Sequence, residues 1–277
     1  MQLFVDQLTN VDFSYLDESR GLVGETWLAN FALEGELDQQ SMVCDFGIVK
    51  KTFRKWLDET LDHKLLVPKH SASLSITTSN GTTQLTWQSV SGEITMSAPE
   101  DAITLVDGDC ITPETLAAWC QHQALQLMPK TVLNIDVSFE TEHIPGYFYQ
   151  YSHGLKKHDG NCQRIAHGHR STINICKNGR RDFELERAWC EKWRDIYIGT
   201  EEDIIDDING IYKFAYEAPQ GRFELSLPKN NCYIIQTDST VEQIAQHIAQ
   251  VLKSQFPEDA IQVKAFEGIG KGALVSL

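Results

Sequence analysis

The residues best suited to chemistry gather between His153 and His169, a stretch that holds four of the nine histidines and one of the seven cysteines. His167 and His169 are two residues apart, which on a strand places both imidazoles on one face. His153 on a neighbouring strand would add a third nitrogen. Three nitrogens with an open fourth position form the ligand set of catalytic zinc. The pattern therefore predicts a metal site, whereas a His-x-His pair alone is equally typical of an ordinary hydrogen-bonded pair.

Cys162 lies within the same stretch, in a loop rich in Gly, Asp and Asn beside Arg164. A nearby cation or metal lowers the pKa of a thiol and favours a reactive thiolate. As a fourth ligand, Cys162 would instead close the site and make it structural. His158 is interpreted as a loop histidine.

Asp62 and His63 form a second constellation at the end of an expected helix. A carboxylate beside a histidine fixes its tautomer and stabilises the imidazolium, as proton transfer requires. The alternative is a helix C-terminus, where His63 and Lys64 face the negative end of the dipole. Glu140 and Glu267, near later strands, could each accept two hydrogen bonds from a heterocycle edge, or be solvated strand-end residues.

The composition limits the partners. A chain of 277 residues fits one large domain or two of about 140 residues. The net charge of −15 argues against nucleic acid and anionic membranes, but not against a small anionic substrate. No apolar run reaches membrane-spanning length and no signal peptide is recognisable, so we expect a cytoplasmic protein. The seven scattered cysteines fit reduced thiols.

The positioning elements come in two similar sets. Asp45-Phe46 and Lys55-Trp56-Leu-Asp58 recur as Asp182-Phe183 and Lys192-Trp193-Arg-Asp195 at an offset of 137, and Thr112 and Thr240 are expected helix N-caps. Each half reads as two strands, a helix, a hairpin region, a second helix and closing strands, which indicates an α+β fold. Ile144-Pro145-Gly146 breaks the pattern, so the predicted units are 1–145 and 146–277. The expected strands are 3–16, 25–37, 131–141, 147–154, 168–176 and 261–276; the helices 45–60, 113–127, 182–197 and 240–255; the hairpin regions 72–106 and 211–236.

At the offset of 137, each half lacks what the other has. Asp62-His63 aligns with Gly199-Thr200, and the three histidines align with Leu16, Asn30 and Ala32. This predicts one composite site shared by the two units.

The motifs together resemble one family. Cys162-x4-His167-Gly-His169 after His153, the segment from Gly35 through Asp45-Phe46 to Leu61-Asp62-His63-Lys64-Leu65-Leu66, and Val263-x3-Glu267-x4-Gly272 are similar to 6-pyruvoyltetrahydropterin and 6-carboxytetrahydropterin synthases. The resemblance implies tandem tunnelling-fold units (ββααββ) with antiparallel sheets and helices on one face, assembling into β-barrels as a homo-oligomer. The division of the motifs between two units departs from the usual single unit.

Carried over residue by residue, the resemblance implies that His153, His167 and His169 bind Zn²⁺ and that Cys162 is the catalytic thiol. Asp62 and His63 would be the partner dyad. Glu267 matches the pterin anchor better than Glu140, because its spacing to Gly272 is that of the family.

The implied function is that of a zinc-dependent 6-carboxytetrahydropterin synthase-like lyase acting on 7,8-dihydroneopterin triphosphate, a pterin triphosphate of the queuosine pathway. Lys156, Lys157 and Arg164 are candidates for binding the triphosphate. The alternatives are a 6-pyruvoyltetrahydropterin synthase, another tandem tunnelling-fold enzyme such as a urate oxidase or a nitrile reductase, and a non-catalytic pterin- or purine-binding protein. The four residues between Cys162 and His167 fall between the usual three of the carboxy branch and five of the pyruvoyl branch.

Overall fold

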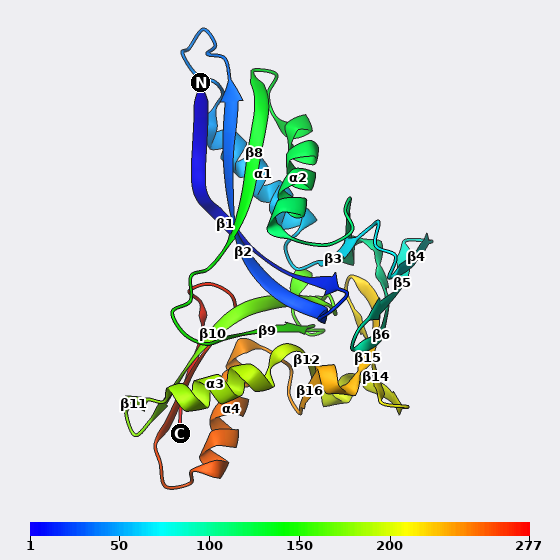
Figure 1. Cartoon of the computed structure of the whole chain (residues 1–277), viewed down its shortest axis with the longest axis vertical. Coiled ribbons are helices and arrows are strands. Elements are labelled where there is room, and N and C mark those ends of the chain that lie inside the picture. Colours follow the sequence, from blue (N-terminus) through cyan, green and yellow to red (C-terminus); the bar gives the residue numbers. More distant parts are fainter.

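The computed structural model describes residues 1–277 and has two units of similar construction, one above the other in Figure 1. In each unit two helices cover one face of a sheet. The first unit consists of β1 (Gln2–Asp17), β2 (Gly21–Gly35), α1 (Phe46–Thr60), β3 (Leu65–Pro68), β4 (Leu74–Ser79), β5 (Thr82–Ser89), β6 (Gly92–Pro99), β7 (Ile103–Val106), α2 (Pro113–Ala124) and β8 (Val132–Thr141). The α+β class and the two tandem units are confirmed.

The second unit repeats this order. It consists of β9 (Phe148–His153), β10 (His167–Lys177), β11 (Arg180–Arg181), α3 (Phe183–Lys192), β12 (Arg194–Thr200), β13 (Ile204–Ile208), β14 (Ile211–Ala218), β15 (Gly221–Pro228), β16 (Cys232–Ile235), α4 (Val241–Gln255), β17 (Ile261–Phe266) and β18 (Gly272–Ser276). The first unit has one closing strand, β8, where the second has the hairpin of β17 and β18. No helix is long and apolar enough to cross a membrane.

The helices begin where their capping residues predict. The side chains of Asp45, Thr112, Asp182 and Thr240 each accept a hydrogen bond from a backbone N–H in the first turn. Helix α3 is shorter than expected, because β12 already begins at Arg194 and the chain must turn before it. The buried faces of the helices pack on the sheets, for example Phe53 of α1 on Phe31 of β2.

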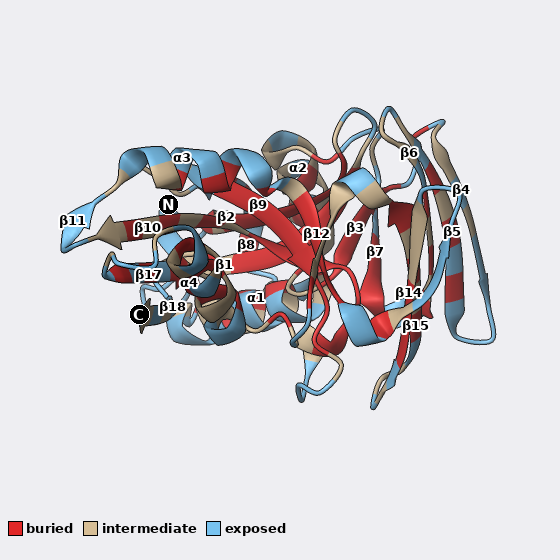
Figure 2. Cartoon of the chain, turned by 90° about the horizontal axis from the view of Figure 1, so that it is seen from below, coloured by how far each residue is buried: buried red, intermediate tan, exposed pale blue.

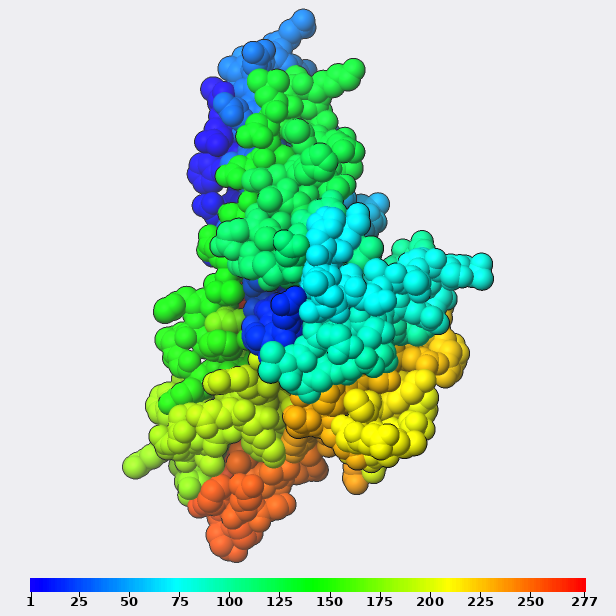
Figure 3. All heavy atoms as spheres, turned by 45° about the vertical axis from the view of Figure 1, so that its right-hand side comes forward, coloured from blue at the N-terminus to red at the C-terminus, as the bar shows by residue number.

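The sheets are mixed rather than wholly antiparallel. The central strands pair antiparallel, but β3 and β7 continue the first sheet in parallel beside β1, and β12 and β16 do the same beside β9. The two hairpin regions form a third sheet of order β13-β14-β15-β6-β5-β4, in which β15 of the second unit pairs with β6 of the first. In Figure 3 these two regions lie against each other on one flank of the molecule.

The two units meet where β1 and β2 cross β9 and β10, among the buried strands at the centre of Figure 2. The hydroxyls of Ser14 and Ser152 are 2.7 Å apart at this crossing. A Cβ on Gly24 would lie 1.8 Å from the carbonyl oxygen of Tyr151, and one on Gly168 would lie 2.6 Å from the Cα of Gly24. Only glycine permits backbones to approach this closely, so both glycines are required for the units to dock.

Strand register corrects the predicted alignment of the halves. In the first unit Leu65 of β3 pairs with Ser14 of β1, and in the second unit Tyr197 of β12 pairs with Ser152 of β9. The strands β1 and β9 therefore correspond at an offset of 138, and β3 and β12 correspond at an offset of 132. Ser14 pairs with Gly24 and Ser152 with Gly168, so β2 matches β10 at 144. The offset of 137 holds from the N-caps Asp45 and Asp182 along the helices and is lost where α3 ends, because α1 has 15 residues and α3 has 10.

The corrected register changes the counterparts of the site residues. Asp62-His63 corresponds to Arg194-Asp195 rather than Gly199-Thr200, and φ of His63 and of Asp195 are 54° and 53°. The three histidines at 153, 167 and 169 correspond to Tyr15, Val23 and Glu25 rather than Leu16, Asn30 and Ala32. The complementary losses nevertheless remain, because the first unit carries no histidine at these positions.

Candidate active site

Three imidazoles converge at the end of the β9–β10 pair. His153 and His167 are directly cross-strand neighbours, and His169 follows two residues later on the same face. One ring nitrogen from each lies within 4.8 Å of the others, and all three side chains are at most 1% exposed. The alternation along a strand thus produces the cluster that the sequence predicts.

The other nitrogen of each ring faces an oxygen of the surrounding protein. Nδ1 of His153 is 3.0 Å from the carbonyl oxygen of Ser239, and Nδ1 of His167 is 2.8 Å from the carbonyl oxygen of Arg164. Nδ1 of His169 is 3.3 Å from a carboxylate oxygen of Asp12, which comes from the first unit. The acceptors at Nδ1 of His153 and His167 fix the tautomer in which Nε2 carries the free lone pair. Nδ1 of His169 faces the Asp12 carboxylate but makes no hydrogen bond.

The three Nε2 atoms are buried and have no hydrogen-bond partner. Burial lowers the pKa of His153 and of His167 well below the usual range, so both rings stay neutral. Buried polar atoms without partners are costly, and neutral imidazoles are the form that binds metals. The donor set therefore fits a metal ion with three nitrogen ligands.

The dyad reaches this cluster from the first unit of the same chain. Nδ1 of His63 is 2.5 Å from Oδ2 of Asp62, and Oδ1 of Asp62 accepts the backbone N–H of Asp12 at 2.9 Å. The rings of His63 and His167 have centroids 4.9 Å apart. Burial disfavours the imidazolium, but hydrogen bonds to Asp62 and Cys162 outweigh it and raise the pKa of His63 to about 10.

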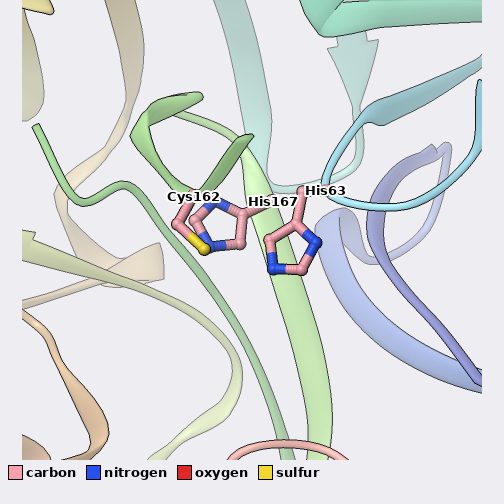
Figure 4. Close-up of side chains that lie close together, drawn as sticks. All are labelled: His63, Cys162 and His167. Atoms are coloured by element: carbon pink, nitrogen blue, oxygen red, sulfur yellow. The ribbon is translucent and has the colours of Figure 1, made fainter. Parts of the chain in front are cut away.

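Cys162 lies beside the dyad. Its Sγ, a His63 nitrogen and a His167 nitrogen lie within 4.8 Å of one another, and Figure 4 shows the three side chains converging from separate segments. The thiol is half-buried and forms no disulfide. Cys162 therefore lies close to both the dyad and the histidine cluster, which is the position that a proton-transfer group would need.

The third sheet holds the cysteine loop in place. The carbonyl oxygen of Gln163 accepts the Tyr216 hydroxyl at 2.8 Å, and its side-chain oxygen accepts the backbone N–H of Gln220 at 2.7 Å. The Gln220 side chain in turn donates to Asn161 at 2.9 Å. Residues on both sides of Cys162 are thus fixed by the β14–β15 hairpin.

Glu267 begins the turn between β17 and β18. Its backbone N–H donates to the carbonyl oxygen of Lys271, and Gly272 pairs with Phe266, where a Cβ would meet the Ala265 oxygen at 2.0 Å. This close approach explains the glycine five residues after Glu267. The carboxylate lies 3.8 Å from Nε2 of His169 and 3.7 Å from Nζ of Lys271, with 23% of the side chain exposed.

Glu140 is not brought to the cluster. It is exposed on β8 and accepts a hydrogen bond from Asn30 at 2.9 Å. Phe139 of β8 pairs with Ala29, and in the second unit Ala265 of β17 pairs with Ile173, the counterpart of Ala29. Phe139 therefore corresponds to Ala265, and two residues further on Thr141, not Glu140, corresponds to Glu267.

Of the three candidate phosphate-binding cations, two are already paired. Lys156 forms ion pairs with Asp203 and Glu202, and Lys157 with Glu202 and Asp238. These ion pairs fasten the loop after β9 to the segments of Glu202–Asp203 and Asp238 in the same unit.

Arg164 remains available for binding phosphate, and Lys64, which the sequence did not suggest, is a second cation without an ion pair. Arg164 contacts only neutral oxygens, those of Gln220 and of the His63 backbone, and it forms no ion pair. Lys64 is 9% exposed and likewise unpaired. Burial lowers the pKa of both, and the charge of Arg164 lowers that of Lys64 further. The carboxylate of Asp101 acts on both from beyond ion-pair distance and opposes this lowering of their pKa.

Sequence reasoning did not identify Asp12, Ser239 or Lys271 as site residues. Asp12 is 2% exposed, and although burial opposes its ionisation, His169, Lys271 and Thr26 hold its pKa at about 2. Nothing in its sequence neighbourhood marks it, because its partner is 157 residues away in the other unit.

The comparisons agree with this architecture. The 6-pyruvoyl tetrahydropterin synthase family model matches residues 11–143 and again residues 147–276. The chain therefore belongs to this family and carries two tandem copies of its domain.

Solved structures of the family are more distantly similar. The 6-pyruvoyltetrahydropterin synthase of Plasmodium vivax is 20% identical with a TM-score of 0.42, covering 50% of this chain and 90% of that one. The Plasmodium falciparum enzyme is 11% identical with a TM-score of 0.27, covering 100% and 97%. No curated protein matches the chain.

Proposed function

We propose that the protein is a zinc-dependent lyase that acts on 7,8-dihydroneopterin triphosphate, in the manner of a 6-carboxytetrahydropterin synthase. One observation carries the proposal: three partnerless buried Nε2 atoms meet beside a thiol and an Asp-His dyad. A metal site with an acid–base pair at its open side suits proton abstraction from carbon and elimination of a leaving group.

The metal's part is limited to one kind of chemistry. Zinc held by His153, His167 and His169 would act as a Lewis acid that acidifies the C–H and O–H groups of the substrate side chain. Cys162, as a thiolate, would take the proton released from carbon. His63, whose Nδ1–H is held by Asp62, would carry the thiol proton on Nε2 as an imidazolium and pass it to a substrate oxygen.

The remaining residues would bind the two ends of the substrate. Glu267, whose carboxylate lies 3.8 Å from Nε2 of His169, would accept hydrogen bonds from the N–H/NH2 edge of the pterin. Arg164 and Lys64 would bind the triphosphate, which leaves as the proton is removed. Both cations lie near His63, so the leaving group would sit on the dyad side of the cluster.

The product distinguishes two forms of this proposal. The carboxy branch breaks a carbon–carbon bond and releases acetaldehyde after triphosphate leaves, whereas a 6-pyruvoyltetrahydropterin synthase stops at elimination and internal redox transfer. The matching family is described by the name of the second form, which is kept as the alternative. Incubating the zinc-loaded protein with 7,8-dihydroneopterin triphosphate and assaying acetaldehyde and triphosphate separates the two.

The same assay tests the proposal as a whole. We expect the His167→Ala protein to lose metal by elemental analysis and to release no triphosphate. Cys162→Ala should lose turnover by about 100- to 10,000-fold and retain its metal. A wild-type protein that releases neither product while holding zinc and pterin would be a non-catalytic binder. Assembly of several chains into barrels remains a prediction, to be measured by light scattering.

A further inference from the structure

The turn between β17 and β18 carries a lysine beside Glu267. Nζ of Lys271 is 3.7 Å from Oε2 of Glu267 and 3.6 Å from Oδ2 of Asp12. The other carboxylate oxygen of Glu267, Oε1, is 3.8 Å from Nε2 of His169. Glu267 therefore has the histidine cluster beside one oxygen and an ammonium beside the other.

The turn is held in place by both units. The backbone N–H of Gly268 donates to Oγ of Ser171 in the second unit at 3.1 Å. A Cβ on Gly268 would lie 2.7 Å from Oδ1 of Asp12 in the first unit, and φ of Gly268 is 67°, so only glycine suits this position. Asp12, which faces Lys271 with its second oxygen, is 2% exposed. The packing thus fixes the segment that carries Glu267 and Lys271.

Both charged side chains keep polar groups open toward a ligand. The distances of 3.6, 3.7 and 3.8 Å are longer than a hydrogen bond. The carboxylate of Glu267 therefore has free acceptor positions, and the ammonium of Lys271 has free N–H donors. The side chains are 23% and 52% exposed respectively, so a ligand can reach both. An acceptor group and a donor group stand side by side at the cluster.

This pair complements one edge of a 2-amino-4-oxopteridine ring. That edge presents the 2-amino group and N3–H, which donate, followed by the 4-oxo oxygen, which accepts. A carboxylate can accept from the two donors while a neighbouring ammonium donates to the oxygen. A 2,4-diaminopteridine presents an NH2 group in place of the oxygen, and an NH2 group facing an ammonium sets donor against donor.

We infer that Lys271 is a specificity-determining residue, which donates a hydrogen bond to the 4-oxo group of the ring and thereby selects it over a 4-amino ring. The inference rests on the binding of a pterin at Glu267 in the proposed function, but not on its turnover. A lysine that served only to neutralise Asp12 and Glu267 would affect both kinds of ring alike, so the preference between them separates the two roles.

Equilibrium binding of two ring probes to the zinc-loaded protein tests this inference. 6-Hydroxymethylpterin and 2,4-diamino-6-hydroxymethylpteridine differ only in the 4-substituent, carry no triphosphate to eliminate and are both uncharged near neutral pH. Titration followed by their fluorescence gives the dissociation constant of each. We expect the wild type to bind the 4-oxo probe more tightly than the 4-amino probe.

The Lys271 variants should change this preference selectively. Lys271→Met, which removes the ammonium and keeps an unbranched side chain, should weaken binding of the 4-oxo probe by about 10- to 100-fold. It should not weaken binding of the 4-amino probe, so the preference is lost. Lys271→Arg keeps a charged donor and should retain the preference. Elemental analysis should show the zinc content of the wild type in both variants.

Lys264→Met is the matched control. It removes an exposed lysine of β17 whose ammonium lies over the Phe266 ring, and it should leave both dissociation constants unchanged. A wild type that binds neither probe, or binds both equally, would overturn the inference. An unchanged preference in Lys271→Met, or equal weakening of both probes, would overturn it as well. Turnover of the pterin triphosphate is measured separately: turnover without the preference refutes only this inference, and the preference without turnover refutes only the lyase activity.

Discussion

Replacing Asp62 by asparagine should separate the role of the dyad from that of the metal. In the structure Oδ1 of Asp62 accepts the Asp12 N–H, and Oδ2 faces Nδ1 of His63 at 2.5 Å. An asparagine would keep its oxygen on the Asp12 N–H and turn its NH2 group toward His63. That group can only donate, so Nδ1 of His63 must accept and the ring keeps a single proton on Nε2. The ring can then no longer hold a second proton taken from Cys162.

The size of the effect follows from the lost interaction. A hydrogen bond to a charged group contributes about 1.5–3 kcal/mol. The side chains of Asp62 and His63 are 23% and 15% exposed, so solvent screens the interaction little. If it acts in the transition state, kcat should fall by about 10- to 100-fold, while the metal content stays that of the wild type.

The measurements are steady-state turnover of 7,8-dihydroneopterin triphosphate, elemental analysis for zinc and ¹⁵N NMR of the histidine rings. NMR should show His63 changing from an imidazolium protonated on both nitrogens, as its pKa of about 10 requires, to the neutral Nε2–H tautomer. Asp58→Asn is the matched control: it removes a neighbouring carboxylate on α1 that makes no hydrogen bond to His63. A kcat for Asp62→Asn within twofold of the wild type, with the tautomer changed, would refute the proposed role of the dyad.

Three further predictions address other parts of the molecule. Because His63 and Cys162 meet within one chain, mixing His63→Ala and Cys162→Ala chains should recover no activity, and recovery would show that the site forms between chains. Asp12→Asn should weaken zinc binding by about 10- to 100-fold, measured by chelator competition, because it removes the carboxylate that orients one ligand; unchanged affinity would contradict that role. Glu25 is 5% exposed, and burial raises its pKa from 4.5 to about 7, so the folded state binds its proton more tightly than the unfolded state does. The stabilisation is complete below pH 4.5 and is lost as the pH rises through about 7, so Glu25→Gln should gain up to about 3 kcal/mol over the wild type at pH 8 in denaturant unfolding; a pH-independent difference would contradict this.

The sequence alone determined the local structure and the contents of the site. Asp45, Thr112, Asp182 and Thr240 start their helices because capping depends on residues within one turn. Asn80-Gly81 joins β4 and β5 with both residues at positive φ, as such a dipeptide predicts. The histidine cluster follows from strand alternation, and the dyad from two adjacent residues.

Only the tertiary structure decided how the halves correspond and what surrounds the site. The repeat was misaligned because α3 is shorter than α1 and the loop of Cys162 has no equivalent between β1 and β2, changes that a constant offset cannot follow. Asp12 reaches His169, and Arg20 reaches Asp195, only because Gly24 and Gly168 let two sheets cross in contact. Such partners are determined by the packing of segments that lie far apart in the sequence, so the residues next to them in the sequence do not predict them.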